Sequence, residues 1–201
     1  MMGARVQVSG APIEPHSLIL ANHVSWLDIL ALGGATGCAF VSKDKLGHGL
    51  IHWLADQNHT VYVRREHVKG AKDQAASIAR AVERDSVAVF PEGTVGPGTH
   101  LLPFRSTLIE AVNYADKDVV IRPVALDYGP EVAEIAWYHE PVKSNILRVL
   151  GRRKPVQIHV RLLDPLPRSG DRKAIARDAR STIGNALGFK LEEHASIGQG
   201  Q

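Results

Sequence analysis

A histidine and an aspartate stand five residues apart in the segment ANHVSWLDIL, which spans residues 21–30. An aspartate bonded to one imidazole nitrogen fixes the tautomer and leaves the other nitrogen free to take a proton from an alcohol. On a single ideal helix, five steps of about 100° would put His23 and Asp28 on different faces. We therefore expect His23 on a turn before a helix that carries Asp28, where the two side chains can converge.

The same segment also has a purely structural interpretation. Ser25 and Asp28 form an S-x-x-D pattern, in which Asp28 closes the start of a helix as in a capping box. His23 would then be an ordinary polar loop residue. Taken alone, this segment leaves both interpretations open.

A second cluster, FPEGT, spans residues 90–94. Pro91 ends the hydrogen-bond ladder of the preceding strand, and Gly93 lets the backbone turn sharply and come close to a ligand. Glu92 is therefore expected at the carboxyl end of a sheet strand, where open α/β sheets bind their ligands. The structural alternative for Glu92 is a solvated carboxylate in a turn.

Short apolar runs alternate with helical patterns along the chain. The strands we expect lie at 17–21, 38–42, 60–64, 86–90, 119–126 and 156–163, with a weaker one at 135–138. The helices we expect lie at 26–32, 46–55, 69–84, 104–114 and 171–187. A loop rich in glycine and proline is expected at 93–103. This alternation predicts an α/β fold with a mixed, largely parallel sheet flanked by helices, and antiparallel strands near the end.

No linker, internal repeat or low-complexity tract divides the 201 residues, so we expect one domain over residues 1–201. Its charge is unevenly distributed. The net charge is +3, yet residues 143–180 hold eleven Lys and Arg against three Asp. This basic C-terminal region, which we extend to about residue 190, could meet an anionic membrane face or the phosphates of nucleic acid.

Several other signals are weak. The stretch without charged residues at 29–42 is too short for a bilayer span, and the start of the chain lacks the apolar region of a secretory signal. Cys38 is the single cysteine and is expected to be a small buried apolar residue. His48 and His52 have the spacing of a metal-ligand pair. The sequence has no second clustered His pair or further Cys to complete the coordination shell, so no metal is expected.

The two clusters together resemble the glycerolipid acyltransferase family typified by 1-acylglycerol-3-phosphate acyltransferase. That family combines an Asn-His pair, an Asp five residues after the His (the HX4D motif) and a later FPEGT. Two further stretches match its pattern, HTVYVRR at 59–65 and IRPVA at 121–125. The resemblance covers about residues 17–126 and implies the α/β sandwich of that family.

The resemblance implies transfer of an acyl group from acyl-CoA or acyl carrier protein to the hydroxyl of a lysolipid, most directly 1-acylglycerol-3-phosphate. It implies that His23 is the general base, that Asp28 orients it and that attack is direct. No G-x-S-x-G elbow for a serine nucleophile is present in the sequence. No cofactor besides the acyl donor is implied. The implied substrate-binding residues are Asn22, Lys43, Arg65, Glu92, Gly93 and Thr94.

Two departures from the family pattern bear on the acceptor. His59 stands where the second block usually opens with Gly, and Val95 and Gly96 follow FPEGT where Arg-Ser or Thr-Ser is common. A contact with an anionic head group, which the family pattern places after FPEGT, is therefore missing. The stretch GTHLLPFRSTL at 98–108 looks most like bacterial members, some of which acylate lyso-ornithine lipid, an amino-acid lipid without phosphate. Lyso-ornithine lipid is therefore the alternative acceptor.

Many members of the family are held on the bilayer by N-terminal apolar helices, whereas this sequence reaches His23 almost at once. Either the basic region and apolar surface replace those helices, or the start is truncated. We expect a cytoplasmic protein attached peripherally to the inner face of the cell membrane through its anionic surface. The alternative of another class is a basic module that binds lipid or nucleic acid without catalysis. Because no nucleic-acid motif is present, nucleic acid is not an expected partner.

Overall fold

One six-stranded sheet forms the centre of the protein in the computed structural model, which describes residues 3–40, 71–115 and 118–189. The spatial order is β1-β6-β5-β2-β4-β3. The strands are β1 (Ala4–Ser9), β2 (Ser17–Ala21), β3 (Ala39–Phe40), β4 (Val87–Val89), β5 (Val120–Asp127) and β6 (Val156–Leu162). Only the β5–β6 pair is antiparallel among these six strands. The predicted mixed, largely parallel sheet is thus confirmed, including antiparallel pairing late in the chain.

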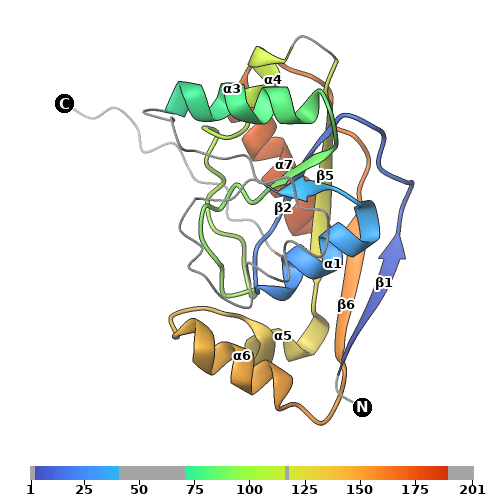
Figure 1. Cartoon of the computed structure of the whole chain (residues 1–201), viewed down its shortest axis with the longest axis vertical. Coiled ribbons are helices and arrows are strands. Elements are labelled where there is room, and N and C mark those ends of the chain that lie inside the picture. The colour runs from blue at the N-terminus through green and yellow to red at the C-terminus, as the bar shows by residue number, and fades with distance from the viewer. Residues whose placement is uncertain (1–2, 41–70, 116–117, 190–201) are drawn as a thin grey trace, which may run out of the picture.

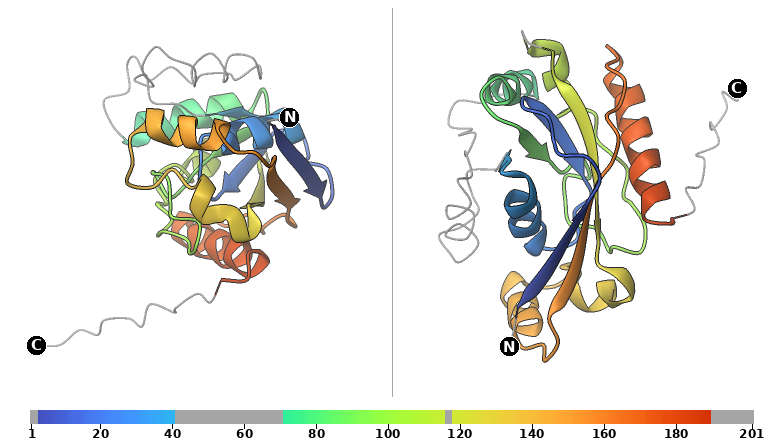
Figure 2. Two further views of the ribbon diagram at one scale, coloured as in Figure 1. Left: turned by 90° about the horizontal axis from the view of Figure 1, so that it is seen from below. Right: turned by 90° about the vertical axis from the view of Figure 1, so that its right-hand side faces the viewer.

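The helices lie on both sides of this sheet. Figure 2 shows α1 and α7 on opposite faces, with α5 and α6 beyond one end. The helices are α1 (Leu27–Thr36), α3 (Ala71–Val82), α4 (Ala111–Tyr114), α5 (Val132–Ile135), α6 (Val142–Leu150) and α7 (Arg172–Ala186), with a 3₁₀ turn η1 (Gly129–Glu131) before α5. Among the helices in the described ranges, none is long and apolar enough to cross a membrane.

β2 lies inside the sheet and leads directly to the predicted HX4D segment. It runs parallel to β5 on one side and β4 on the other, and all five of its residues are buried. Ile19 packs in the apolar cluster that contains α1, whereas Leu20 packs with Ile175 of α7 on the opposite face. A continuous apolar run is what a parallel strand buried on both faces requires. Asn22 and His23 follow at its carboxyl end.

Most predicted elements lie close to their observed positions. The strand at 17–21 has the predicted bounds, and those at 119–126 and 156–163 agree within one residue. The final helix and the helix at 69–84 correspond to α7 and α3. The helix predicted at 46–55 and the strand predicted at 60–64 lie outside the described residues.

Two predicted elements are wrong. The helix at 104–114 is reduced to α4, because the chain before it forms turns in which the Ala111 and Val112 N–H groups donate to carbonyls three residues earlier, at Leu108 (3.4 Å) and Ile109 (3.1 Å). The strand at 135–138 is absent, since α5 ends at Ile135 and the Trp137 N–H donates to the Val24 carbonyl (2.9 Å). A short apolar run does not distinguish a strand from a helical turn.

The sequence interpretation also missed β1 and α6. β1 is the exposed edge strand beside β6 (Figure 1), with Val6 and Val8 about half exposed. α6 follows the residues predicted as the weak strand and packs beside α5. Both elements lie at the periphery, where the apolar pattern that marks a buried strand is weakest.

Candidate active site

His23 lies on the turn between β2 and α1, and Asp28 lies in the first turn of α1. The His23 Nδ1 and the Asp28 Oδ2 are 2.7 Å apart. The Asp28 side chain is fully buried, whereas 15% of the His23 side chain is exposed. Because the helix begins after His23, the two side chains converge across five residues, as a single helix would not allow.

Asp28 accepts hydrogen bonds from four groups. Its Oδ2 accepts from His23 and from the backbone N–H groups of Val24 (2.6 Å) and Ser25 (2.9 Å). Its Oδ1 accepts from the Tyr128 hydroxyl at 2.5 Å. Four donors around one carboxyl group are the bonding pattern of an ionised, acceptor-only carboxylate. Asp28 therefore closes the start of α1 and holds His23 at once, so the structural and the chemical interpretations describe the same group.

The hydrogen bond to Asp28 fixes the orientation of the His23 ring and leaves one ring nitrogen, Nε2, without a partner in the described ranges. Since Nδ1–H is donated to Asp28, Nε2 is the acceptor nitrogen of the neutral ring. Phe90 stacks on this ring, with centroids 4.1 Å apart and planes at 14°. No residue in the described ranges forms a hydrogen bond with Nε2. An oriented imidazole with an available basic nitrogen has the geometry of a general base.

Glu92 lies beneath His23 and not on the surface. It is 3% exposed, and its Oε1 accepts from the His23 N–H (2.8 Å) while its Oε2 accepts from the Leu102 N–H (2.9 Å). Burial raises the pKa of Glu92 above its ordinary value, although these two N–H groups act in the opposite direction. A solvated turn carboxylate is thus excluded, and Glu92 positions the backbone that carries the imidazole.

Gly96 ties the loop after FPEGT to the same backbone. Its N–H donates to the His23 carbonyl at 2.7 Å, so Glu92 and Gly96 hold both polar groups of the His23 main chain. A Cβ at position 96 would lie 2.8 Å from the Glu92 Oε2. The departure from the family pattern at this position therefore fits the local packing, because a side chain there would displace the Glu92 carboxylate.

Asn22 contacts β5 and not the open side of the site. Its Nδ2 donates to the Leu126 carbonyl (3.0 Å) and its Oδ1 accepts from the Leu126 N–H (2.8 Å). Asn22 is 2% exposed. Its side chain thus extends the hydrogen bonding between β2 and β5 beyond the end of β2. The β5 backbone thus uses both ends of the Asn22 amide, and the predicted substrate contact of Asn22 stays a prediction.

The other predicted substrate residues divide into two groups. Gly93, with φ +72°, and Thr94 are exposed on the turn next to Glu92. Lys43 and Arg65, like His48 and His52, lie outside the residues that the structure describes. Within those residues no group of three or more His, Cys, Asp or Glu side chains could hold a metal ion.

Cys38 packs in the apolar cluster of α1, as predicted for a small buried residue. Burial raises the pKa of the Cys38 thiol to about 11. A thiol that resists ionisation is a poor nucleophile, so this cysteine is not a chemical group of the site.

Two residues of the site were missed by the sequence interpretation. Tyr128 directly follows β5 and is 4% exposed, with its hydroxyl on Asp28. Its position after a parallel strand was the available signal, because the carboxyl ends of β2 and β5 meet at one edge of the sheet. Arg105 is exposed, and a Cβ at Gly93 would lie 3.3 Å from its Nε and Cζ. The Arg105 guanidinium therefore lies over the FPEGT turn, although Val95 stands where the family often has an arginine.

Part of the basic region is paired with acidic side chains in the fold. Five of its eleven basic side chains form ion pairs with acidic residues from earlier in the chain. The pairs are Arg148 with Glu140, Arg152 with Glu131 and Glu134, Arg161 with Asp127, Arg168 with Asp118, and Arg172 with Glu110. The region is therefore not a continuous cationic surface, because much of its charge is compensated locally.

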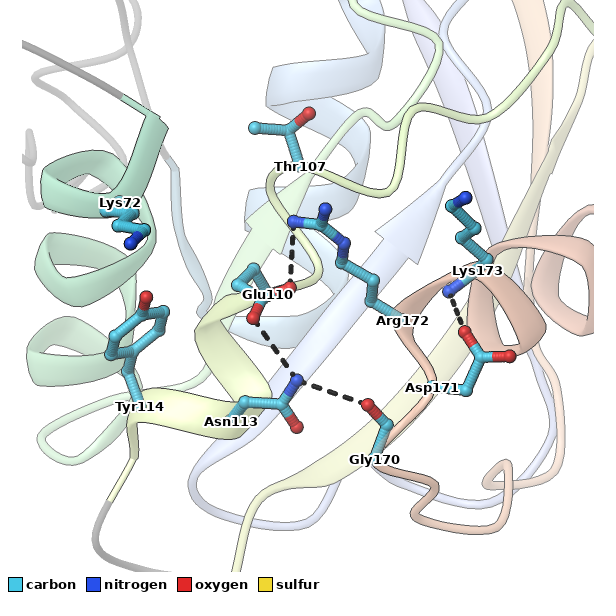
Figure 3. A pocket seen from close by; sticks show the side chains of 9 residues that line it. All are labelled: Lys72, Thr107, Glu110, Asn113, Tyr114, Gly170, Asp171, Arg172 and Lys173. Atoms are coloured by element: carbon cyan, nitrogen blue, oxygen red, sulfur yellow. Dashed lines mark hydrogen bonds and ion pairs between the residues drawn. The ribbon is translucent and has the colours of Figure 1, made fainter.

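A hollow of about 400 Å³ lies away from the predicted site residues (Figure 3). It is formed where α3 and α4 meet the start of α7, and the Glu110–Arg172 ion pair (2.9 Å) crosses it. Asn113 donates to the Gly170 carbonyl at 3.3 Å beside this pair. Because the Glu110–Arg172 pair crosses it and Asp171 accepts from the Lys173 N–H (2.8 Å), this hollow indicates no particular ligand.

A family model described as Acyltransferase matches residues 5–127. Two relatives named lyso-ornithine lipid O-acyltransferase come from Rhodobacter capsulatus and Pseudomonas aeruginosa. They are 30% and 33% identical over 94% and 90% of this chain, and each match covers 72% of the relative.

A 1-acyl-sn-glycerol-3-phosphate acyltransferase from Neisseria gonorrhoeae is 30% identical over 72% of this chain and 58% of that protein. Among solved structures, the 1-acyl-sn-glycerophosphate acyltransferase of Thermotoga maritima matches with a TM-score of 0.63. That match covers 92% of this chain and 72% of the other, at 19% identity. At such low identity the structural match supports the fold alone.

Proposed function

The chain belongs to the acyltransferase family, and on this premise we propose that His23 activates the hydroxyl of a lysolipid for acylation by a thioester. The acyl donor is acyl-CoA or acyl carrier protein, and no resident cofactor takes part. The observation that carries this proposal is the His23–Asp28 pair, whose 2.7 Å hydrogen bond leaves Nε2 available.

The proposed reaction is one direct transfer. Nε2 of His23 takes the hydroxyl proton while the oxygen attacks the thioester carbonyl carbon. The new C–O bond forms, the C–S bond breaks, and the thiolate that leaves takes the proton from the imidazolium. Asp28 balances the charge of that imidazolium and keeps Nδ1 protonated throughout. No acyl-enzyme forms, so each turnover releases one thiol and one acylated lipid.

We propose lyso-ornithine lipid as the first candidate acceptor. Two relatives with that name match at least 90% of this chain at 30% and 33% identity, which favours it. Its carboxylate would meet Arg105, which lies over Gly93 beside the site. An arginine fork suits a carboxylate because it can donate two parallel hydrogen bonds.

The second candidate acceptor is 1-acylglycerol-3-phosphate. It is favoured by the relative of that name at 30% identity, and Arg105 suits a phosphate as well as a carboxylate. Lys43, Arg65 and Thr94 are proposed as further head-group contacts for either lipid, as the family resemblance implies. Both acceptors are membrane lipids, so we propose that the reaction takes place at the anionic cytoplasmic face of the cell membrane.

An acceptor panel tests this proposal. Purified protein is mixed with one acyl-CoA and either lyso-ornithine lipid, 1-acylglycerol-3-phosphate or no acceptor, and the release of CoA thiol is followed. Product lipid is identified by mass spectrometry. We expect thiol release that depends on the acceptor and is faster with lyso-ornithine lipid. Equal release with and without acceptor would contradict acyl transfer, and faster release with 1-acylglycerol-3-phosphate would reverse the order of the two candidates.

A further inference from the structure

α6 has an apolar face that the described parts of the chain leave uncovered. Leu147 is 72% exposed and Leu150 is 44% exposed, and Tyr138 just before the helix is 40% exposed. The opposite side of α6 is buried through Asn145 and Val149. Leucines at positions i and i+3 lie on one face of a helix, so Leu147 and Leu150 present a single apolar strip outward.

Basic side chains flank this strip without acidic partners in the described ranges. Lys143 lies one turn before Leu147 on the same helix face, and Arg153 and Lys154 follow the helix; all three are exposed. The acidic residues nearby, Glu131, Glu134 and Glu140, are instead paired with Arg148 and Arg152. The uncompensated charge beside the leucines is therefore positive.

α6 is also fixed to the candidate active site. The Trp26 Nε1 donates to the Asn145 Oδ1 at 3.1 Å, and the Trp137 N–H donates to the Val24 carbonyl at 2.9 Å. Trp26 and Val24 belong to the turn that joins His23 to Asp28. The α5–α6 segment lies beyond the end of the sheet where β5 ends (Figure 1), and β2 runs parallel to β5. A surface bound by α6 would thus lie at the His23 end of the molecule.

We propose that this surface docks the protein on an anionic membrane. It is named the α6 face and consists of Lys143, Leu147, Leu150, Arg153 and Lys154. Leucines enter the boundary between head groups and acyl chains, and basic side chains contact anionic head groups, as in interfacial amphipathic helices. The inference deepens the proposed membrane site of the reaction and rests on it, since docking would hold His23 next to lipids of that membrane.

The apolar half of the α6 face is tested with Leu147→Ser and Leu150→Ser combined. Binding is measured by co-sedimentation with vesicles of phosphatidylcholine alone or mixed with phosphatidylglycerol, with no substrate present. We expect the wild type to prefer the mixed vesicles and the variant to bind them at least about tenfold more weakly. Val6→Ser combined with Val8→Ser is the matched control, because those residues are exposed apolar side chains on β1. The control should bind like the wild type.

The basic half is tested with Arg153→Gln and Lys154→Gln combined. We expect binding to fall about fivefold for each charge removed and the loss to shrink at high salt. Lys173→Gln combined with Arg177→Gln, two exposed basic residues of α7, is the matched control and should bind like the wild type.

Three results would overturn the docking proposal: no vesicle binding by the wild type, equal binding by the α6 variants, or a dimer in light scattering that the leucine variant abolishes. The docking and the reaction can fail separately. Acylation of acceptor dispersed in detergent should be unchanged in the α6 variants, while acylation of acceptor in vesicles should fall. Vesicle binding without any acylation would leave docking intact and contradict the proposed reaction.

Discussion

The turn after β2 and the basic region of residues 143–180 hold their charged side chains in opposite ways. At the turn, Asp28 is fully buried and takes its donors mainly from residues within five positions of it. In the basic region, Arg152 and Arg168 pair with acidic residues far along the chain, on partly exposed surfaces. The turn is built to hold one imidazole, whereas the ion pairs mainly reduce the net charge of a surface.

This difference determines what a substitution should do. Removal of a hydrogen bond inside a buried, fully satisfied network moves the group that the network positions, so the main loss is in kcat. Removal of one member of a partly exposed ion pair costs little stability, because water screens the charges that remain. The four predictions below test this contrast, from the largest expected effect to the smallest.

Asp28→Asn is expected to lower kcat by about a thousandfold, within the usual range for general base catalysis. The amide oxygen of the substituted side chain can still accept from the Val24 and Ser25 N–H groups, which hold the start of α1. The neutral amide cannot balance an imidazolium at His23. Thiol release measures kcat, and thermal unfolding of the same preparation checks that the fold is retained. A variant with kcat within threefold of the wild type would make Asp28 a capping residue only.

Tyr128→Phe is expected to lower kcat by about tenfold, with KM little changed, because it removes one hydrogen bond to the Asp28 carboxylate. Tyr128 touches no substrate in this account and acts through Asp28. The pH profile of kcat should therefore shift, which a purely structural loss would not cause. Tyr138→Phe, at an exposed tyrosine, is the control. An unchanged pH profile in Tyr128→Phe would contradict the role of Tyr128 in positioning Asp28.

Arg152→Gln and Arg153→Gln compare a paired with an unpaired arginine. Arg152→Gln should lower the free energy of unfolding by about 1 kcal/mol, because it loses the ion pairs with Glu131 and Glu134. Arg153→Gln should change it by less than about 0.5 kcal/mol. Denaturant unfolding measures both values. Equal destabilisation by the two variants would contradict the distinction between compensated and uncompensated charge.

The pH dependence of stability tests the burial of Glu92. Burial raises the pKa of Glu92, so between its unfolded and folded pKa values the folded protein binds more protons than the unfolded chain. This group therefore lowers the free energy of unfolding as pH rises from its ordinary pKa through the raised folded value. The stability advantage of the wild type over Glu92→Gln should shrink across that window. An advantage that grows with pH there would mean that the folded pKa is lowered instead.

The sequence was sufficient where structure is determined locally. The run SLILA predicted β2 with the observed bounds, because a parallel strand buried on both faces needs continuous apolar residues. The spacing of His23 and Asp28 allowed them to meet, because His23 lies on the turn just before the helix that carries Asp28.

The rest depends on contacts between distant residues. Tyr128 reaches Asp28 from a hundred positions away, and Asn22 is bound by the backbone of β5. Neither contact follows from residue type until the order of strands in the sheet is known. The charge of residues 143–180 could be counted from the sequence, but its compensation by Glu131 and Glu134 required the fold.

The most direct test of the central claim is the rate of acceptor-dependent thiol release by His23→Ala. The measurement uses acyl-CoA and the better acceptor of the panel. His159→Ala on β6 serves as the matched control. We predict a loss of kcat of about a thousandfold or more in His23→Ala, with unchanged thermal unfolding and a control equal to the wild type. Release by His23→Ala within tenfold of the wild type would contradict the assignment of His23 as the general base.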